Sequence, residues 1–204
     1  FADIEDETFN LDPGSVEENI TPLTKAIMVP DIFGHPAELD SLVDIAKKHD
    51  LMLIEDCSQS PKAKYKEQFA GTIGDIGILS LNYHKHIHTG EGGICLTDDP
   101  ILAERMQLIR NHAEAVVGDK GVTDLTNMIG LNFRLGEIEA AIGIAQYKKL
   151  DKIIESRVHH AAQLNLGLEN VEGLRTPITK DDCTHVFYGY PIVIDVDSLG
   201  CSRQ

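Results

Sequence analysis

The sequence predicts an α/β protein built around a mostly parallel sheet. Two short apolar strands flank one amphipathic helical segment between residues 25 and 55, which is the pattern of a βαβ unit with a right-handed crossover. Two further apolar stretches follow at 76–81 and 93–97. A last apolar stretch, 185–195, comes after long helical patterns, and we expect it to belong to a different sheet.

The first strand is predicted at 25–29, where Pro30 closes an apolar run. The next strand, 51–55, is short and apolar up to its last residue. Between them a helix is predicted over 36–48, with Pro36 suited to its first turn. Its apolar residues recur at i, i+3, i+4 and i+7, at Leu39, Leu42, Val43 and Ala46.

Asp99-Pro100 is typical of a helix start, and a helix is predicted over 100–110. Residues 112–130 have weak periodicity and predict a loop. From 135 to 168 the pattern is helical, with a break expected near Leu150-Asp151. We therefore expect a domain boundary near residue 150, which separates 1–150 from 151–204.

Composition excludes several classes of partner. The 204 residues carry a formal net charge of −15, which argues against a surface for nucleic acid or anionic membranes. No apolar run approaches the roughly 18–20 residues that a membrane helix needs. The cysteines are scattered without a CxxC pair, which favours reduced thiols and a cytoplasmic protein. They are Cys57, Cys95, Cys183 and Cys201.

One lysine lies where Schiff-base chemistry is favoured. Lys85 stands between the apolar run 76–81 and the glycine turn 90–93, so its apolar stem can reach inward. Asp56 directly follows the strand 51–55, and ligands in parallel sheets bind beyond the carboxyl ends of strands. An acid that holds a pyridine nitrogen protonated and a lysine that forms an aldimine are the main protein groups of pyridoxal 5'-phosphate (PLP) catalysis.

These residues belong to an ordered series. The series runs Asp56, Gln59, Gly74-Asp75-Ile76-Gly77, Ser80, Lys85 and Gly90-Glu91-Gly92-Gly93. Further stretches that match are 21–27, 34–40, 110–112 and 132–135 leading into 139–143. In order and spacing the chain closely resembles the sugar aminotransferase family of the DegT/StrS type, whose members are PLP enzymes of the aspartate-aminotransferase fold (fold type I).

The resemblance implies a two-domain fold, of which this chain would form a part. Residues 1–150 would form part of a three-layer α/β/α large domain that binds PLP on a mixed, mostly parallel sheet. Residues 151–204 would form a linking helix and the start of a small α+β domain. Because family members are considerably longer, we expect the chain to be an internal fragment that lacks an upstream phosphate-binding loop.

The resemblance also implies roles for five residues. Asp56 would pair with the pyridinium nitrogen, and Lys85 would form the aldimine with PLP and then carry protons. Ser80 would donate its hydroxyl to the cofactor phosphate, and Gln59 would lie over the ring or near its phenolic oxygen. Asn132 would reach the phosphate of the neighbouring subunit, which makes the enzyme a homodimer with shared active sites.

The implied reaction moves an amino group from an amino acid, glutamate in our interpretation, to a keto-sugar carried on a nucleotide. Such a reaction serves amino-sugar and polysaccharide biosynthesis. A related subgroup with histidine in place of the aldimine lysine dehydrates keto-sugars instead. Aligning the glycine turn 90–93 puts Lys85 at that position, which favours transamination.

Three histidines alternate around the lysine and allow another interpretation. In an extended segment His84, His86 and His88 would share one face, as the imidazoles of a zinc or iron site do. They also differ from the smaller or amide residues that the family more often has there. The alternatives to transamination are therefore a keto-sugar dehydratase of the same fold and a histidine-rich metal-binding protein.

Overall fold

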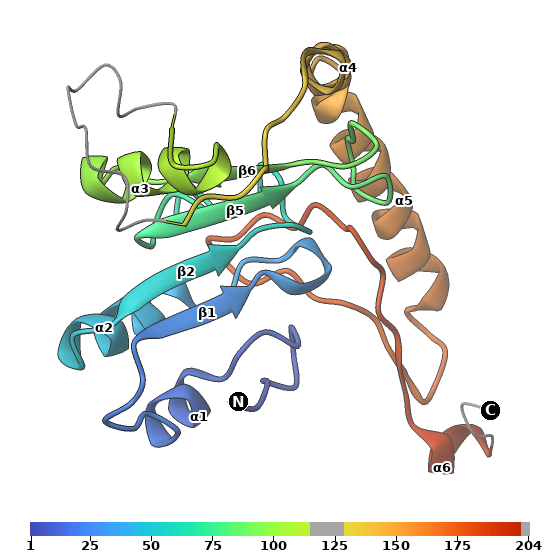
Figure 1. Ribbon diagram of the computed structural model, residues 1–204. Helices are drawn as coiled ribbons and strands as arrows, with labels where there is room; N and C mark the ends of the chain where they lie inside the picture. Colours follow the sequence, from blue (N-terminus) through green and yellow to red (C-terminus); the bar gives the residue numbers. More distant parts are fainter. Residues whose placement is uncertain (115–128, 201–204) are drawn as a thin grey trace.

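The computed structural model describes residues 1–114 and 129–200, and its centre is a four-stranded sheet in the order β1-β2-β5-β6 (Figure 1). β1, β2 and β5 are parallel, and β6 is antiparallel to β5. The strands are Ala26–Pro30, Met52–Asp56, Ile76–Ser80 and Gly93–Leu96. The predicted mixed, mostly parallel sheet is confirmed.

Helix α2 (Leu39–Lys48) covers one face of this sheet, and the main apolar core lies between them. Leu39 and Leu42 are fully buried in a cluster with Val29 and Leu53. The helix begins three residues later than the sequence pattern predicted. In the segment before the helix, the Ala37 amide donates to the buried Asp31 carboxylate at 3.1 Å.

The loop before β5 is held by the buried carboxylate of Glu55. It accepts three backbone amides, from Gly71 at 2.7 Å, Ile73 at 2.7 Å and Gly74 at 2.6 Å. A Cβ at Gly77 would lie 1.9 Å from the Gly71 carbonyl oxygen, so only glycine allows this close approach. The loop therefore packs against the sheet and delivers β5 beside β2.

Several short elements surround the sheet. Helix α3 begins as predicted, because the Asp99 side chain accepts the amides of Ile101 and Leu102. Helix α1 and the hairpin β3–β4 are elements that the pattern did not predict. The bounds are α1 Pro13–Glu18, the 3₁₀ turn η1 Ile32–Gly34, β3 Lys64–Tyr65, β4 Gln68–Phe69 and α3 Pro100–Arg110.

Helices α4 (Glu137–Tyr147) and α5 (Leu150–Leu168) confirm the predicted helical region and its break. The parallel strands point their carboxyl ends toward the side of the molecule where α4 and α5 stand (Figure 1). There Leu150 packs with Leu81 and Ile87 from the loop after β5. The predicted loop 112–130 lies mostly outside the described residues.

The predicted strand 185–195 is wrong in length. Only Val193–Ile194 (β8) is a strand, and it pairs with Leu174–Arg175 (β7) in a separate two-stranded sheet before the short helix α6 (Val196–Leu199). Residues 185–192 form no strand, and Phe187 among them has a φ of 50°. The domain boundary near residue 150 stays a prediction.

In the described ranges, no helix is both long and apolar enough to cross a bilayer. Cys57, Cys95 and Cys183 are free thiols.

Candidate active site

Asp56 and Ser80 lie on the same face of the sheet, at the carboxyl ends of neighbouring parallel strands. β2 and β5 pair Asp56 with Ile78, and Ser80 is two residues further along β5. Because side chains alternate along a strand, all three point to the face opposite α2. Strand spacing puts the two Cα atoms roughly 8 Å apart. A carboxylate and a hydroxyl thus share one edge of the sheet.

Lys85 follows in a loop that Asn82 organises. The Asn82 amide donates to Ser80 Oγ at 3.2 Å, and its carbonyl accepts the Lys85 amide at 2.9 Å. The Asn82 side chain accepts the His84 amide at 3.1 Å and donates to Glu91 Oε1 at 2.8 Å. These bonds close a turn between β5 and the glycine segment 90–93, and Lys85 lies within this turn.

Ser80 and Lys85 line one cavity of about 260 Å³. Most of its wall is apolar and comes from the ends of β5 and β6, the hairpin and the start of α5. The apolar residues include Leu79, Leu81, Ile87, Ile94, Leu96 and Leu150. The loop that carries Lys85 therefore borders a largely apolar cavity.

Gln59 lies close to Asp56 in sequence, but its side-chain oxygen is bound elsewhere. Gln59 Oε1 accepts the Phe33 amide at 2.7 Å and ties the segment after β2 to the turn η1. Asp56 Oδ1 accepts the Ser58 amide at 3.1 Å, which uses one of the two carboxylate oxygens. Neither residue lines the lysine cavity.

A buried acid orders the segment between Asp56 and Gln59. Asp31 Oδ2 accepts the Ser60 hydroxyl at 2.9 Å and the Cys57 thiol at 3.3 Å. Burial is the main cause that raises the pKa of Asp31 to about 6, and burial likewise raises the pKa of the Cys57 thiol, so this thiol is inert. Sequence analysis missed Asp31, because nothing local distinguishes it from a loop carboxylate.

Asn132 stands apart from the other predicted site residues. It is exposed and forms an isolated antiparallel bridge with Asn111 after α3. Arg134 donates to Asn111 Oδ1 at 3.0 Å and holds the same strand-like stretch. Asn132 does not line the lysine cavity, which agrees with the predicted role toward a neighbouring subunit without testing it.

The three histidines around Lys85 do not converge. Their segment is a turn and not an extended strand, so the alternation does not align the rings. His84 is exposed against Tyr83, whereas His86 is buried and bonded through Nε2 to the Val186 carbonyl at 3.0 Å. Within the described residues, the one group of potential metal ligands that does converge is Asp31, Glu55 and Cys57. The basis of the metal interpretation is therefore absent.

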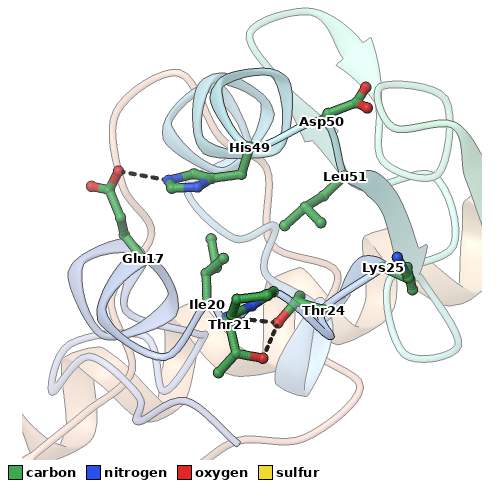
Figure 2. A pocket seen from close by; sticks show the side chains of 9 residues that line it. Glu17, Ile20, Thr21, Thr24, Lys25, His49, Asp50 and Leu51 are labelled. Atoms are coloured by element: carbon green, nitrogen blue, oxygen red, sulfur yellow. Dashed lines mark hydrogen bonds and ion pairs between the residues drawn. The ribbon is translucent and has the colours of Figure 1, made fainter.

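A larger hollow, of about 480 Å³, lies at the other end of the strands (Figure 2). Lys25 and Leu51, which precede β1 and β2, line it together with Glu17 and His49. His49 Nε2 lies 3.2 Å from Glu17 Oε1. The hydroxyls of Thr21 and Thr24, which also line the hollow, bond to each other. None of the predicted site residues is there.

Two residues of the site come from far along the chain. The Nζ atom of Lys85 lies 4.6 Å from the centroid of the Tyr188 ring. Arg157 of α5 donates to the carbonyl oxygens of Phe187 and Tyr188 at 3.0 and 3.3 Å. No local sequence signal identifies this partnership, because the residues meet only through folding.

The chain is similar to known proteins over nearly its whole length. The model of the DegT/DnrJ/EryC1/StrS aminotransferase family matches residues 1–203. The L-glutamine:2-deoxy-scyllo-inosose aminotransferase of Micromonospora echinospora is 34% identical over 206 residues, which cover 98% of this chain and 49% of that protein. The chain spans about half the length of the curated relatives it matches.

Solved structures give the same result. DesV of S. venezuelae, in complex with a ketimine intermediate, is 30% identical with a TM-score of 0.84, over 94% of this chain and 50% of that chain. The E coli GDP-4-keto-6-deoxy-D-mannose-3-dehydratase with bound hydrated PLP is 30% identical with a TM-score of 0.84, over 97% of this chain and 54% of that one. The chain therefore belongs to the DegT/DnrJ/EryC1/StrS aminotransferase family.

Proposed function

We propose that the full-length protein is a PLP-dependent aminotransferase that moves an amino group from an amino acid to a nucleotide-linked keto-sugar. The observation that carries this proposal is the position of Lys85 in the turn directly after β5, whose last residue Ser80 shares a sheet face with Asp56 of the neighbouring strand β2. Glutamate is the proposed donor, and glutamine is the second to test because the Micromonospora relative is named for it. A cytoplasmic location goes with this proposal.

The chemistry of the residues present fits the cofactor. A carboxylate suits a protonated pyridine nitrogen, a hydroxyl suits a phosphate and a lysine amine suits an aldehyde. Asp56 and Ser80 point to one face of the sheet and Lys85 follows in the adjoining loop, an arrangement that suits a set acting on one small molecule. When bound, PLP supplies an electron sink for the carbon from which a proton is removed.

Each residue then has a defined task. The Asp56 carboxylate lies at the end of β2, and it would hold the pyridine nitrogen in its protonated form. Ser80 Oγ would donate to the phosphate. Lys85 would bind the cofactor covalently through Nζ and, once released, accept and return a proton at that atom. Gln59, whose side chain accepts the Phe33 amide, would contact the pyridine ring of the cofactor.

Keto-sugar dehydration is the alternative, and the similarity to the E coli dehydratase keeps it open to test. Alignment on the glycine turn supports transamination, because it puts Lys85 where that subgroup has histidine. A dehydratase would eliminate a sugar hydroxyl and would leave no nitrogen on the product.

The proposal is tested on the purified full-length protein. We expect an absorbance band of bound cofactor that borohydride removes, with the reduced cofactor found on Lys85 by peptide mass spectrometry. Glutamate or glutamine should convert the band, and a keto-sugar nucleotide should then gain nitrogen. Labelling at another lysine, or a sugar product without nitrogen, would contradict the proposal.

We also propose a homodimer with shared active sites. Helix α4 has no buried residue, and the stretch before it exposes large apolar side chains on both sides of Asn132. Exposed apolar residues of this stretch and of α4 include Ile129, Phe133, Ile138, Ile144 and Tyr147. Apolar surface of this extent is typical of a covered interface. A second copy of the full-length protein is the occupant that the family resemblance implies.

Mixing two inactive full-length variants tests this arrangement. A heterodimer of Lys85→Ala and Asn132→Ala has one site with both lesions and one with neither, so activity should recover toward one intact site per heterodimer. Mixing Lys85→Ala with Ser80→Ala is the control, because each subunit then keeps its own lesion and no intact site forms. Mixed dimers that form and stay inactive would show that Asn132 does not serve the opposite subunit.

A further inference from the structure

The ring of Tyr188 lies against the amine of Lys85. The Nζ atom is 4.6 Å from the ring centroid, within the range of a cation–π interaction. Both side chains are partly buried, which reduces the competition from water. An aromatic face attracts an ammonium group without forming a covalent bond to it, so it can hold the amine and release it again.

The backbone that carries Tyr188 is anchored from two elements. Arg157 of α5 donates to the carbonyl oxygens of Phe187 and Tyr188, and the Val186 amide donates to the Gly34 carbonyl at 2.9 Å. Gly34 has a φ of 98°, and a Cβ there would lie 3.0 Å from the Tyr188 nitrogen. Glycine in the turn η1 is therefore what allows the segment to approach so closely.

The residue before Tyr188 is strained. Phe187 has a φ of 50°, a left-handed conformation that is unfavourable for a bulky residue. Its amide donates to His185 Nδ1 at 3.1 Å, and the two rings stack with centroids 3.9 Å apart. Such a conformation persists only where the surroundings hold it, and it clusters at sites that need a fixed geometry.

The lysine loop is joined to the same segment. His86 Nε2 lies 3.0 Å from the Val186 carbonyl oxygen, across 100 residues of sequence. A carbonyl only accepts, so Nε2 carries the hydrogen. Burial is the main cause that lowers the pKa of His86, which favours the neutral ring. The bond fixes the loop directly beside Lys85.

We propose that Tyr188 is a positioning residue whose ring holds the Lys85 amine whenever that amine is not bonded to the cofactor. The anchored segment, the strained Phe187 and the bond from His86 together keep the ring at one place relative to the loop. The aromatic face acts here and the phenolic hydroxyl does not, so phenylalanine should substitute for tyrosine. The catalytic part of this inference rests on the proposed function.

The contact is tested first without catalysis. Lysines of the cofactor-free full-length protein are reductively methylated with ¹³C, and the Lys85 resonance is assigned by its loss in Lys85→Arg. We expect a ring-current shift for Lys85 in the wild type and in Tyr188→Phe that disappears in Tyr188→Leu. Lys64 and Lys66, which lie over Phe69 and Tyr65, should not move and report that the variant is folded.

Tyr188→Met is the second ring-free variant should the leucine variant not fold, and Tyr190→Leu is the control for loss of a nearby tyrosine ring. A Lys85 resonance that stays unchanged in the ring-free variants would overturn the inference.

Kinetics of the full-length enzyme test the consequence. A cation–π contact of this kind corresponds to a roughly two- to thirty-fold change in rate. Tyr188→Leu should lower kcat by that factor with little change in the KM of the amino donor, while Tyr188→Phe should stay close to wild type. Equal losses in both variants would contradict a role of the ring. If Lys85→Ala kept its activity, the proposed function would fail instead, and the resonance would still decide the contact.

Discussion

Replacing Lys85 by alanine in the full-length protein is expected to abolish amino transfer while cofactor binding stays measurable. Binding should persist because Asp56 and Ser80 keep their positions on β2 and β5. Turnover should be lost because the amine that accepts and returns the proton is gone. The measurement pairs cofactor absorbance with the rate of nitrogen transfer to a keto-sugar nucleotide.

Lys62 is the matched control for this experiment. It lines the same cavity, but its amine bonds to Asp151 of α5, and this bond is the main cause that raises its pKa. A lysine kept protonated by a carboxylate is a poor nucleophile. Lys62→Ala should therefore keep near-normal turnover. Near-normal turnover by Lys85→Ala would refute the central assignment.

Replacing Asp56 by asparagine should lower the rate about a thousandfold, which corresponds to about 4 kcal/mol of barrier. Asparagine has nearly the same shape and can still accept the Ser58 amide, so the fold should persist. What it lacks is the negative charge that keeps a pyridine nitrogen protonated. The check is kcat together with the unfolding midpoint of the same preparation.

Asp99→Asn gives the control for loss of one carboxylate charge. Asp99 caps α3 on the surface, and asparagine is an equally good cap, so neither rate nor stability should change appreciably. An unchanged rate in Asp56→Asn would mean that this carboxylate only supports the turn after β2.

Neighbouring carboxylates on β2 show what the sequence alone could determine. Glu55 and Asp56 are adjacent, and strand alternation sends them to opposite faces. The order of residues from Asp56 to Lys85 predicts Asp56, and not Glu55, as the site residue. That Glu55 instead holds the loop 71–74 depends on three amides that only the folded chain brings to it.

The start of α2 shows why local patterns err at boundaries. Apolar periodicity predicted the helix correctly, because burial of one face against the sheet selects it. Its first residue was wrong: Glu38 is not helical, and the Ala37 amide donates to Asp31, six residues earlier in the chain. A boundary depends on which partner satisfies each amide, and that partner belongs to the tertiary structure.

The sequence by itself determined the parallel sheet, the position of Asp56 and Ser80 at strand ends, and the lysine loop between an apolar strand and a glycine turn. These features follow from short-range periodicity and spacing. Only the tertiary structure decided that Tyr188 meets Lys85, that His86 is a buried donor and that Phe187 is strained. Such contacts join segments about a hundred residues apart, and no local pattern carries them, since packing and hydrogen bonding select them after the sheet has formed.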